Sequence, residues 1–196
     1  MRNRSFIEEA RRRQILDAAI ETIAAVGYAN ASFARISAQA GISPSLISYH
    51  FTSKDELIRT IAQTIDADLR QWVAAAAEGA DSHLSAARAI VIGFVHFVDR
   101  NRSQMLTLRQ LETALSPADR ADVGVLDESS GIDSWEELLR EGQAAGEFRA
   151  LDTRVAAAAI VGMLATIPHE LYVNRTTDVD RLADELATLV ELGIRA

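Results

Sequence analysis

The feature that most constrains the fold is a helix stop followed at once by a helix start, within residues 40–44. Gly41 suits the C-terminal end of a helix, because a residue without a Cβ adopts the left-handed conformation at the least cost. Ser43 has the side chain of an N-cap, and Pro44 then occupies the first helical position, where its missing N–H is no loss. The pattern predicts a helix-turn-helix at about residues 33–52, whose second helix can lie in the DNA major groove.

The composition favours helices throughout the chain. The 196 residues are rich in alanine, with only three prolines and ten glycines, and this balance favours helix over sheet. No cysteine is present, which excludes disulfides, thiolate chemistry and cysteine-ligated zinc. We therefore expect an all-α protein, either one large helical domain or a small domain attached to a larger one.

The charge is divided unevenly along the chain. The net charge is −8, which taken alone argues against a nucleic-acid partner. Residues 1–60 nevertheless carry eight basic and six acidic side chains, whereas residues 61–196 carry twelve and twenty-two. A mildly basic first part on an acidic body suits a protein that meets phosphates with one face only, although a chance imbalance explains the division about as well.

Apolar residues recur at helical spacing over most of the chain. Ser53 is a predicted N-cap, with Glu56 as the third residue of a capping box, and Asp152 and Asp178 suit helix starts. Residues 116–133 combine acids, glycines and serines and predict a mobile connection with at most a short helix. The predicted helices span about 9–26, 33–40, 44–50, 54–78, 84–100, 103–115, 134–145, 152–174 and 178–194, with a kink or early end at Pro168 in the eighth.

These helices predict two domains. Residues 1–53 form an N-terminal arm and the helix-turn-helix domain, and residues 54–196 form a larger helical domain, with the helix at 54–78 bridging the two. The charged N-terminal residues have no apolar run behind them. The longest apolar run, Val155–Ala165, is shorter than the roughly 18–20 residues that cross a bilayer. We therefore expect a soluble cytoplasmic protein without a membrane partner.

The residues around the turn form an extended motif. It comprises G-Y at 27–28, the capping Ser32, A-G-I-S at 40–43 and Y-H-F-x-S-K-D-E-L at 49–57. Without gaps from Ile15 to Ile61, about a quarter of the chain, it resembles the TetR/AcrR family of bacterial transcriptional regulators. The remaining residues resemble the family in length and helix order.

The resemblance implies a protein of about nine helices that binds a palindromic DNA operator as a homodimer, most often as a repressor. It implies dimerisation through the helices at 152–174 and 178–194. A small, largely apolar effector would bind in the C-terminal domain, tilt the helix at 54–78 and release the DNA.

The resemblance also implies a set of DNA-contacting residues around the helix starts. Serine hydroxyls bond to base edges or phosphates, and a tyrosine hydroxyl donates to a phosphate. For His50, packing or a backbone bond is as plausible as DNA contact, whereas Leu46, Ile47 and Phe51 are predicted core residues. The candidates are Phe33, Ser43, Pro44, Ser45, Ser48, Tyr49, His50 and Lys54, the last being the only lysine of the chain.

Two departures from the family pattern predict modest direct readout by this helix. Many members carry a tyrosine or another large residue where Ser48 stands, and a glycine or basic residue near Pro44 and Ser45. Proline removes a backbone donor at that point. Arg2 and Arg4 of the N-terminal arm are candidates to compensate by reaching into a minor groove, a hypothesis that rests on their position alone.

Polar groups within apolar helices mark candidate ligand-binding residues. The alternative is that these residues belong to an ordinary core or to a dimer interface, and Arg109 with Glu112 is most simply a local ion pair. A family-type pocket would combine apolar walls with a few polar anchors. The candidates are Trp72, Phe94, His96, Phe97, Met105, Arg109, Trp135, Met163, Ile167, His169 and Tyr172.

Enzymatic motifs are missing from the sequence. We find no glycine-rich phosphate loop, G-x-S-x-G or H-E-x-x-H pattern, and the four histidines are far apart in the chain. We therefore expect no catalytic activity, cofactor or metal. A helical dimer that never binds DNA is the remaining alternative, but it leaves the outward-facing polar residues of the predicted second helix unexplained.

Overall fold

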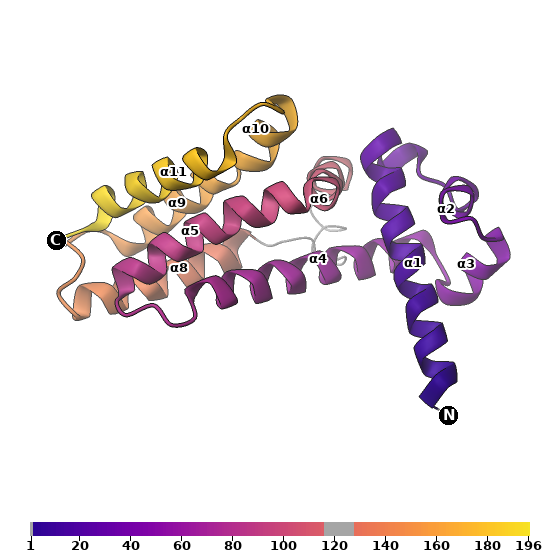
Figure 1. The fold of residues 1–196 in the computed structure, drawn as a ribbon, viewed down its shortest axis with the longest axis horizontal. Coiled ribbons are helices and arrows are strands. Elements are labelled where there is room, and N and C mark those ends of the chain that lie inside the picture. Colours follow the sequence, from indigo (N-terminus) through magenta and orange to yellow (C-terminus); the bar gives the residue numbers. More distant parts are fainter. Residues whose placement is uncertain (1, 116–127) are drawn as a thin grey trace. The chain divides into compact units, whose positions relative to one another are not determined.

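The computed structural model describes residues 2–115 and 128–196. Side chains are described for residues 6–115 and 130–196. It confirms the all-α prediction: the part described contains no strand apart from an isolated bridge between Phe148 and Arg195. The helices are α1 (Arg2–Val26), η1 (Tyr28–Asn30, a 3-10 helix), α2 (Phe33–Ala40), α3 (Pro44–His50), α4 (Lys54–Ala77), α5 (His83–Arg100), α6 (Arg102–Ala114), α8 (Glu128–Ala144), α9 (Thr153–Leu164), α10 (Ile167–Val173) and α11 (Val179–Ile194) (Figure 1).

Contacts divide the chain into two compact units. Among the described residues, the first gathers 2–66 with 103–115, and the second gathers 67–102 with 128–196. Helix α4 is therefore shared between the units, and α6 belongs with the helix-turn-helix rather than with the later helices. The predicted boundary at residues 53–54 separates the DNA-binding residues from the rest of the chain by function, whereas the two units are defined by contacts. The functional boundary stays a prediction.

The core of the first unit is formed by side chains of α1, α2, α3 and the first part of α4. Helix α6 also packs here, and its buried Thr107 donates a hydrogen bond to the backbone oxygen of Ile20 over 3.1 Å. A unit of this size has few core residues, so each contributes heavily to stability. The fully buried large side chains here are Ile15, Ile23, Ile36, Ile47, Phe51, Leu57, Ile58, Ile61, Ile65, Leu108 and Leu111.

In the second unit, α5 is the central helix. It contacts α8, α9, α10 and α11 (Figure 1), and it buries Val91, Val95, Phe97 and Val98. The end of the chain is bonded to the loop after α8, because the Arg149 N–H donates to the Ile194 oxygen over 2.9 Å.

Several predicted boundaries require correction. Helix α1 begins at Arg2 and not near residue 9, so Arg2 and Arg4 continue a helix rather than form an extended arm; their side chains lie outside the described residues. The charged first turns hid this start, because they show no apolar stripe. Helix α8 begins at Glu128, within the predicted connection at 116–133, and residues 116–127 of that connection lie outside the described residues.

The predicted helix at 152–174 is divided into α9 and α10. The break falls at Ala165 and Thr166, so the helix ends early, which is one of the two outcomes predicted from Pro168. The proline itself lies in the first turn of α10. Proline is accepted there because the N–H groups of the first turn have no intrahelical partner. The side chains of Asp152 and Asp178 cap α9 and α11 as predicted.

The same region bears on the expectation about membranes. The 21-residue stretch Thr153–Val173 is long and apolar enough to cross a bilayer, judged by length and composition alone. It exceeds the run Val155–Ala165 on which the prediction was based. One such stretch is weak evidence, since the core helices of soluble proteins pass the same test.

Gly142 in α8 allows a close approach that a larger residue would prevent. A Cβ at this position would lie 2.2 Å from the ring of Phe148, whose side chain is buried. We expect Gly142→Ala to lower the free energy of unfolding by about 1–3 kcal/mol, because the ring must leave its packed position. Gly131 in the same helix is the control, since a Cβ there would meet only Val161 at an ordinary 3.8 Å. Gly131→Ala should be neutral or stabilising by up to about 1 kcal/mol, and equal denaturation midpoints for the two variants would contradict the packing argument.

Candidate DNA-binding interface

The helix-turn-helix forms as its sequence predicted, and its first helix, α2, packs against α1. The Ser32 hydroxyl accepts a hydrogen bond from the Arg35 N–H over 3.3 Å at the start of α2. Gly41 ends that helix with φ of 67°, in the left-handed region. The Gln14 side chain of α1 donates to the Ala40 oxygen over 2.8 Å, so it satisfies one of the carbonyls that a helix C-terminus leaves unpaired.

The start of α3 differs from the prediction in one respect. Ser43 occupies the N-cap position and Pro44 follows it, but the Ser43 side chain makes no capping hydrogen bond. Its hydroxyl lies 2.9 Å from the hydroxyl of Ser45 instead. The Ser45 hydroxyl takes the place of the backbone N–H groups of the second and third helical residues, to which an N-cap side chain ordinarily bonds. The two exposed hydroxyls therefore form a pair on the surface at the start of α3.

Helix α3 divides into a buried and an exposed side. Ile47 and the following Phe51 are fully buried, as predicted, whereas the Tyr49 side chain is 71% exposed. His50 is half-buried, with its ring edge-on to Tyr49 at 5.1 Å between centroids. Phe33, at the start of α2, is half-buried too. The structure thus brings five of the predicted candidates together on one exposed surface: Ser43, Pro44, Ser45, Ser48 and Tyr49.

Lys54 faces its own chain. Its ammonium donates to the Tyr28 oxygen over 2.7 Å and lies 4.0 Å from the centre of the Tyr28 ring. Partial burial lowers the pKa of Lys54 below its ordinary value, against the opposing influence of Asp55. In this conformation Lys54 joins the start of α4 to η1.

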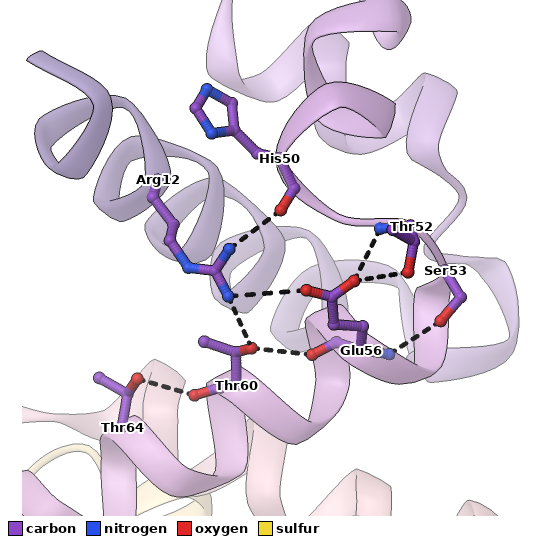
Figure 2. A network of polar contacts seen from close by, with 7 residues as sticks. All are labelled: Arg12, His50, Thr52, Ser53, Glu56, Thr60 and Thr64. Carbon is purple, nitrogen blue, oxygen red and sulfur yellow. Dashed lines mark hydrogen bonds and ion pairs between the residues drawn. The ribbon is translucent and has the colours of Figure 1, made fainter. Parts of the chain in front are cut away.

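A network of polar contacts joins α1 to the end of α3 and the start of α4 (Figure 2). The Arg12 guanidinium donates to the His50 backbone oxygen over 2.9 Å and to the Thr60 hydroxyl over 3.3 Å. It also lies 3.8 Å from the Glu56 carboxylate and 4.2 Å from the centre of the Phe51 ring. A single side chain of α1 therefore contacts the end of α3 and the start of α4, 38 to 48 residues later in the chain.

Glu56 corrects the predicted capping box. Ser53 caps α4 as expected, since its hydroxyl accepts from the Glu56 N–H over 3.1 Å. The Glu56 carboxylate turns one residue further back, where it accepts from the hydroxyl and the N–H of Thr52 over 2.7 and 2.8 Å (Figure 2). These bonds, with the nearby charge of Arg12, hold the pKa of Glu56 below its ordinary value.

The predicted ligand-binding residues are spread over both units. On α6, in the first unit, Met105 is buried and Arg109 is exposed. In the second unit, the Trp72 N–H donates to the Gly93 oxygen over 2.9 Å, and its ring lies 6.2 Å from that of Phe97. Phe94 is half-buried. Trp72 and Phe97 are the only pair of these candidates in ring contact among the described side chains.

The remaining candidates divide by exposure. Trp135 and Ile167 are buried, and Met163 is half-buried. His96 lies 3.6 Å from the carboxylate of Asp180 on α11, an acid on the protein surface. The other two candidates, His169 and Tyr172 on α10, are exposed. Among the side chains described, no group of three or more histidine, aspartate or glutamate residues is arranged to hold a metal ion.

Sequence reasoning missed Arg12 and Gln14. Both precede the apolar stripe of α1, and Arg12 lies within a run of three arginines that resembles a solvated face. The only available signal was that two bare helix C-termini, at Ala40 and His50, require donors from elsewhere. That signal does not say which side chain supplies them.

Comparison with known proteins now bears on this fold and surface. Residues 15–61 match the family of bacterial regulatory proteins described as the tetR family. Residues 86–193, more than half of the chain, match the tetracyclin repressor-like C-terminal domain. The chain belongs to the TetR family. Members of the TetR family are DNA-binding regulators of transcription with a ligand-binding C-terminal domain, and they are not enzymes. This confirms the prediction of a DNA-binding regulator and the prediction of a protein without catalytic activity.

The curated relatives match part of the chain. The HTH-type transcriptional regulator BetI 1 of Chromohalobacter salexigens is 38% identical over 102 residues, 52% of this chain and 50% of that protein. BetI of Cronobacter sakazakii is 39% identical over 69 residues, 35% and 34% of the two chains. The matched part thus spans half or less of the length of these relatives.

Solved structures match over almost the whole chain. A TetR-family regulatory protein from Rhodococcus RHA1 has a TM-score of 0.81 at 22% identity, covering 95% of this chain and 97% of that one. FadR from Bacillus subtilis, solved in complex with stearoyl-CoA, has a TM-score of 0.77 at 19% identity, covering 93% and 99%. At these identities the likeness shows the TetR fold alone.

Proposed function

We propose that this TetR-family protein is a transcriptional repressor that binds a palindromic operator as a homodimer and is released by a small, largely apolar effector. The observation that carries the proposal is the exposed surface of α3. Its hydroxyls stand outward, while Ile47 and Phe51 on the opposite side are buried. A short helix held in this way suits insertion into a major groove.

The exposed residues of α3 have separate proposed roles. Ser45 and Ser48 contact base edges or phosphates, and Tyr49 donates its hydroxyl to a phosphate. Ser43 and Pro44 approach the backbone at the helix start. Phe33 and His50, both half-buried, support this surface from its edge. Lys54 contributes positive charge near the N-terminus of α4, and a direct phosphate contact requires it to exchange its bond with the Tyr28 oxygen.

The proposal of a homodimer rests on exposed apolar residues of two helices whose other sides pack on α5. On α11, Leu189 and Leu192 are 61% and 70% exposed. On α9, Val155, Ala158, Ala159 and Gly162 are exposed at helical spacing, which places them on one face. Apolar surface of this kind marks an interface, and a second copy meets it with the same surface in a two-fold dimer.

The proposed effector binds in the second unit near Trp72 and Phe97, which lie in ring contact beside α5. Apolar and aromatic walls with few polar groups suit a largely apolar molecule. Because FadR was solved with stearoyl-CoA, long-chain acyl-CoA is a sensible first member of a test panel. We place the protein in the cytoplasm, where a regulator meets the chromosome.

Selection of DNA fragments by the purified protein tests the proposal. We expect enrichment of a palindrome whose half-sites are about one helical turn apart. Affinity for it should fall by about 10³–10⁵ between 50 and 200 mM salt if six to ten phosphates are contacted. A fragment with one half-site scrambled is the control. Absence of any enriched sequence, or equal affinity for the scrambled fragment, would overturn the proposal.

A further inference from the structure

We infer that Arg12 is a positioning residue for sequence-specific DNA binding, which it serves by fixing the C-terminal end of α3 without touching DNA. The role in DNA binding rests on the proposed function. The role of Arg12 in fixing the end of α3 does not depend on it. Nothing in the sequence or in the predicted set of contact residues assigned a role to Arg12.

The first observation concerns the end of the recognition helix. A helix leaves its last carbonyl oxygens without intrahelical partners, and α3 has only seven residues. The Arg12 guanidinium donates to the oxygen of His50, the last residue of α3, over 2.9 Å, and it covers the ring of Phe51 at 4.2 Å (Figure 2). Arg12 therefore holds both the backbone and the buried aromatic anchor at this end of the helix.

The second observation concerns the other partners of the same guanidinium. Arg12 bonds to Thr60 and pairs with Glu56, both on α4. Glu56 in turn accepts from Thr52, which lies between α3 and α4. The planar guanidinium can serve several acceptors at fixed angles. The connection between α3 and α4 is thus held from both ends by one pair of opposite charges.

The third observation separates Arg12 from its neighbour. Arg11 is exposed and donates to Gln14 one turn along the same helix. Arg12 is half-buried, and its guanidinium contacts His50 at the end of α3 and Glu56 and Thr60 on α4. Gln14 performs the matching task for α2 through the Ala40 oxygen. Two side chains of α1 thus donate hydrogen bonds to the C-terminal carbonyl oxygens of the two helices of the motif.

A positioning residue and a phosphate contact affect DNA binding differently. Loss of a phosphate contact weakens all DNA sequences about equally and lowers the salt slope by about one. Loss of a positioning residue leaves the number of phosphate contacts unchanged but misplaces the helix in the groove. Base contacts depend on that placement, so specific affinity falls while non-specific affinity and the salt slope are retained.

The experiment compares Arg12→Met with Arg11→Met, which removes the same charge from the same helix. We expect Arg12→Met to lose on the order of ten-fold more specific affinity than Arg11→Met, the scale of a lost charge-assisted hydrogen bond. The two variants should share one salt slope and one affinity for non-specific DNA. A slope about one unit lower for Arg12→Met, with specific and non-specific affinity reduced equally, would overturn the inference.

Arg12→Lys keeps the charge and tests geometry alone. Lysine cannot serve the His50 oxygen, Thr60 and Glu56 as a planar fork does, so we expect specific affinity between those of the wild type and Arg12→Met. Full wild-type affinity would show that charge suffices, and it would overturn the positioning role.

Amide hydrogen exchange in the free protein decides the structural part without DNA. We expect exchange at Phe51 and Thr52 to become about ten-fold faster in Arg12→Met, while amides in the middle of α1 keep their rates. Unchanged exchange at Phe51 and Thr52 would overturn the inference. If the wild type selected no DNA, the proposed function would fail while this measurement still reported on the contact.

Discussion

Phe51→Ala is expected to lower the free energy of unfolding by about 3–5 kcal/mol, the range for a buried phenylalanine replaced by alanine. The ring is fully buried between α3 and the rest of the first unit, and Arg12 lies over it. The substitution removes the packing that holds the end of α3, and the remaining cavity is too enclosed to close without backbone movement. Chemical denaturation followed by circular dichroism measures the loss.

Tyr49→Ala is the matched control, because it removes an aromatic ring two residues away, on the exposed side of α3. We expect a change in unfolding free energy within about 0.5 kcal/mol. Operator affinity should instead fall about ten-fold through the lost phosphate contact and ring surface. The idea of two opposite sides of α3 would be wrong if Tyr49→Ala were the more destabilising of the two.

The second large effect is expected from Leu189→Asp combined with Leu192→Asp. Two carboxylates in the proposed interface would be buried without partners, so the protein should sediment as a monomer. Operator affinity should then fall at least about 100-fold, because two linked recognition helices gain avidity of about 10²–10⁴ over one. Sedimentation and gel shift measure the two consequences on the same sample.

Gln71→Asp, at an exposed position on α4, is the control for added negative charge. It adds a carboxylate away from the proposed dimer interface. It should leave the dimer intact and reduce affinity only slightly through electrostatic repulsion. A double leucine variant that stays dimeric would place the subunit interface elsewhere.

The predictable parts of the fold are those controlled by local chemistry. Gly41 required the left-handed conformation and Pro44 accepted only a helix start, so neighbouring residues sufficed to place the turn. The capping by Asp152 and Asp178 followed for the same reason. The wrong boundaries lie where local signals were weak, at the charged start of α1 and in the acidic segment before α8.

Side-chain partners across the unit were less predictable. The Ser43 hydroxyl was expected to cap α3 but pairs with Ser45, and Glu56 was expected to close a box with Ser53 but bonds to Thr52. In each case two partners lay within reach along the chain. Packing and neighbouring charges, such as Arg12 beside Glu56, selected one of them.

The sequence by itself determined the helices, the turn and the exposed hydroxyls of α3, because glycine, proline and apolar spacing act over a few residues. Only the tertiary structure decided that α6 joins the first unit and that Arg12 meets the end of α3 thirty-eight residues away. Contacts between such distant residues depend on how helices cross and which side chains reach across the crossing. A pattern along one chain does not contain that geometry.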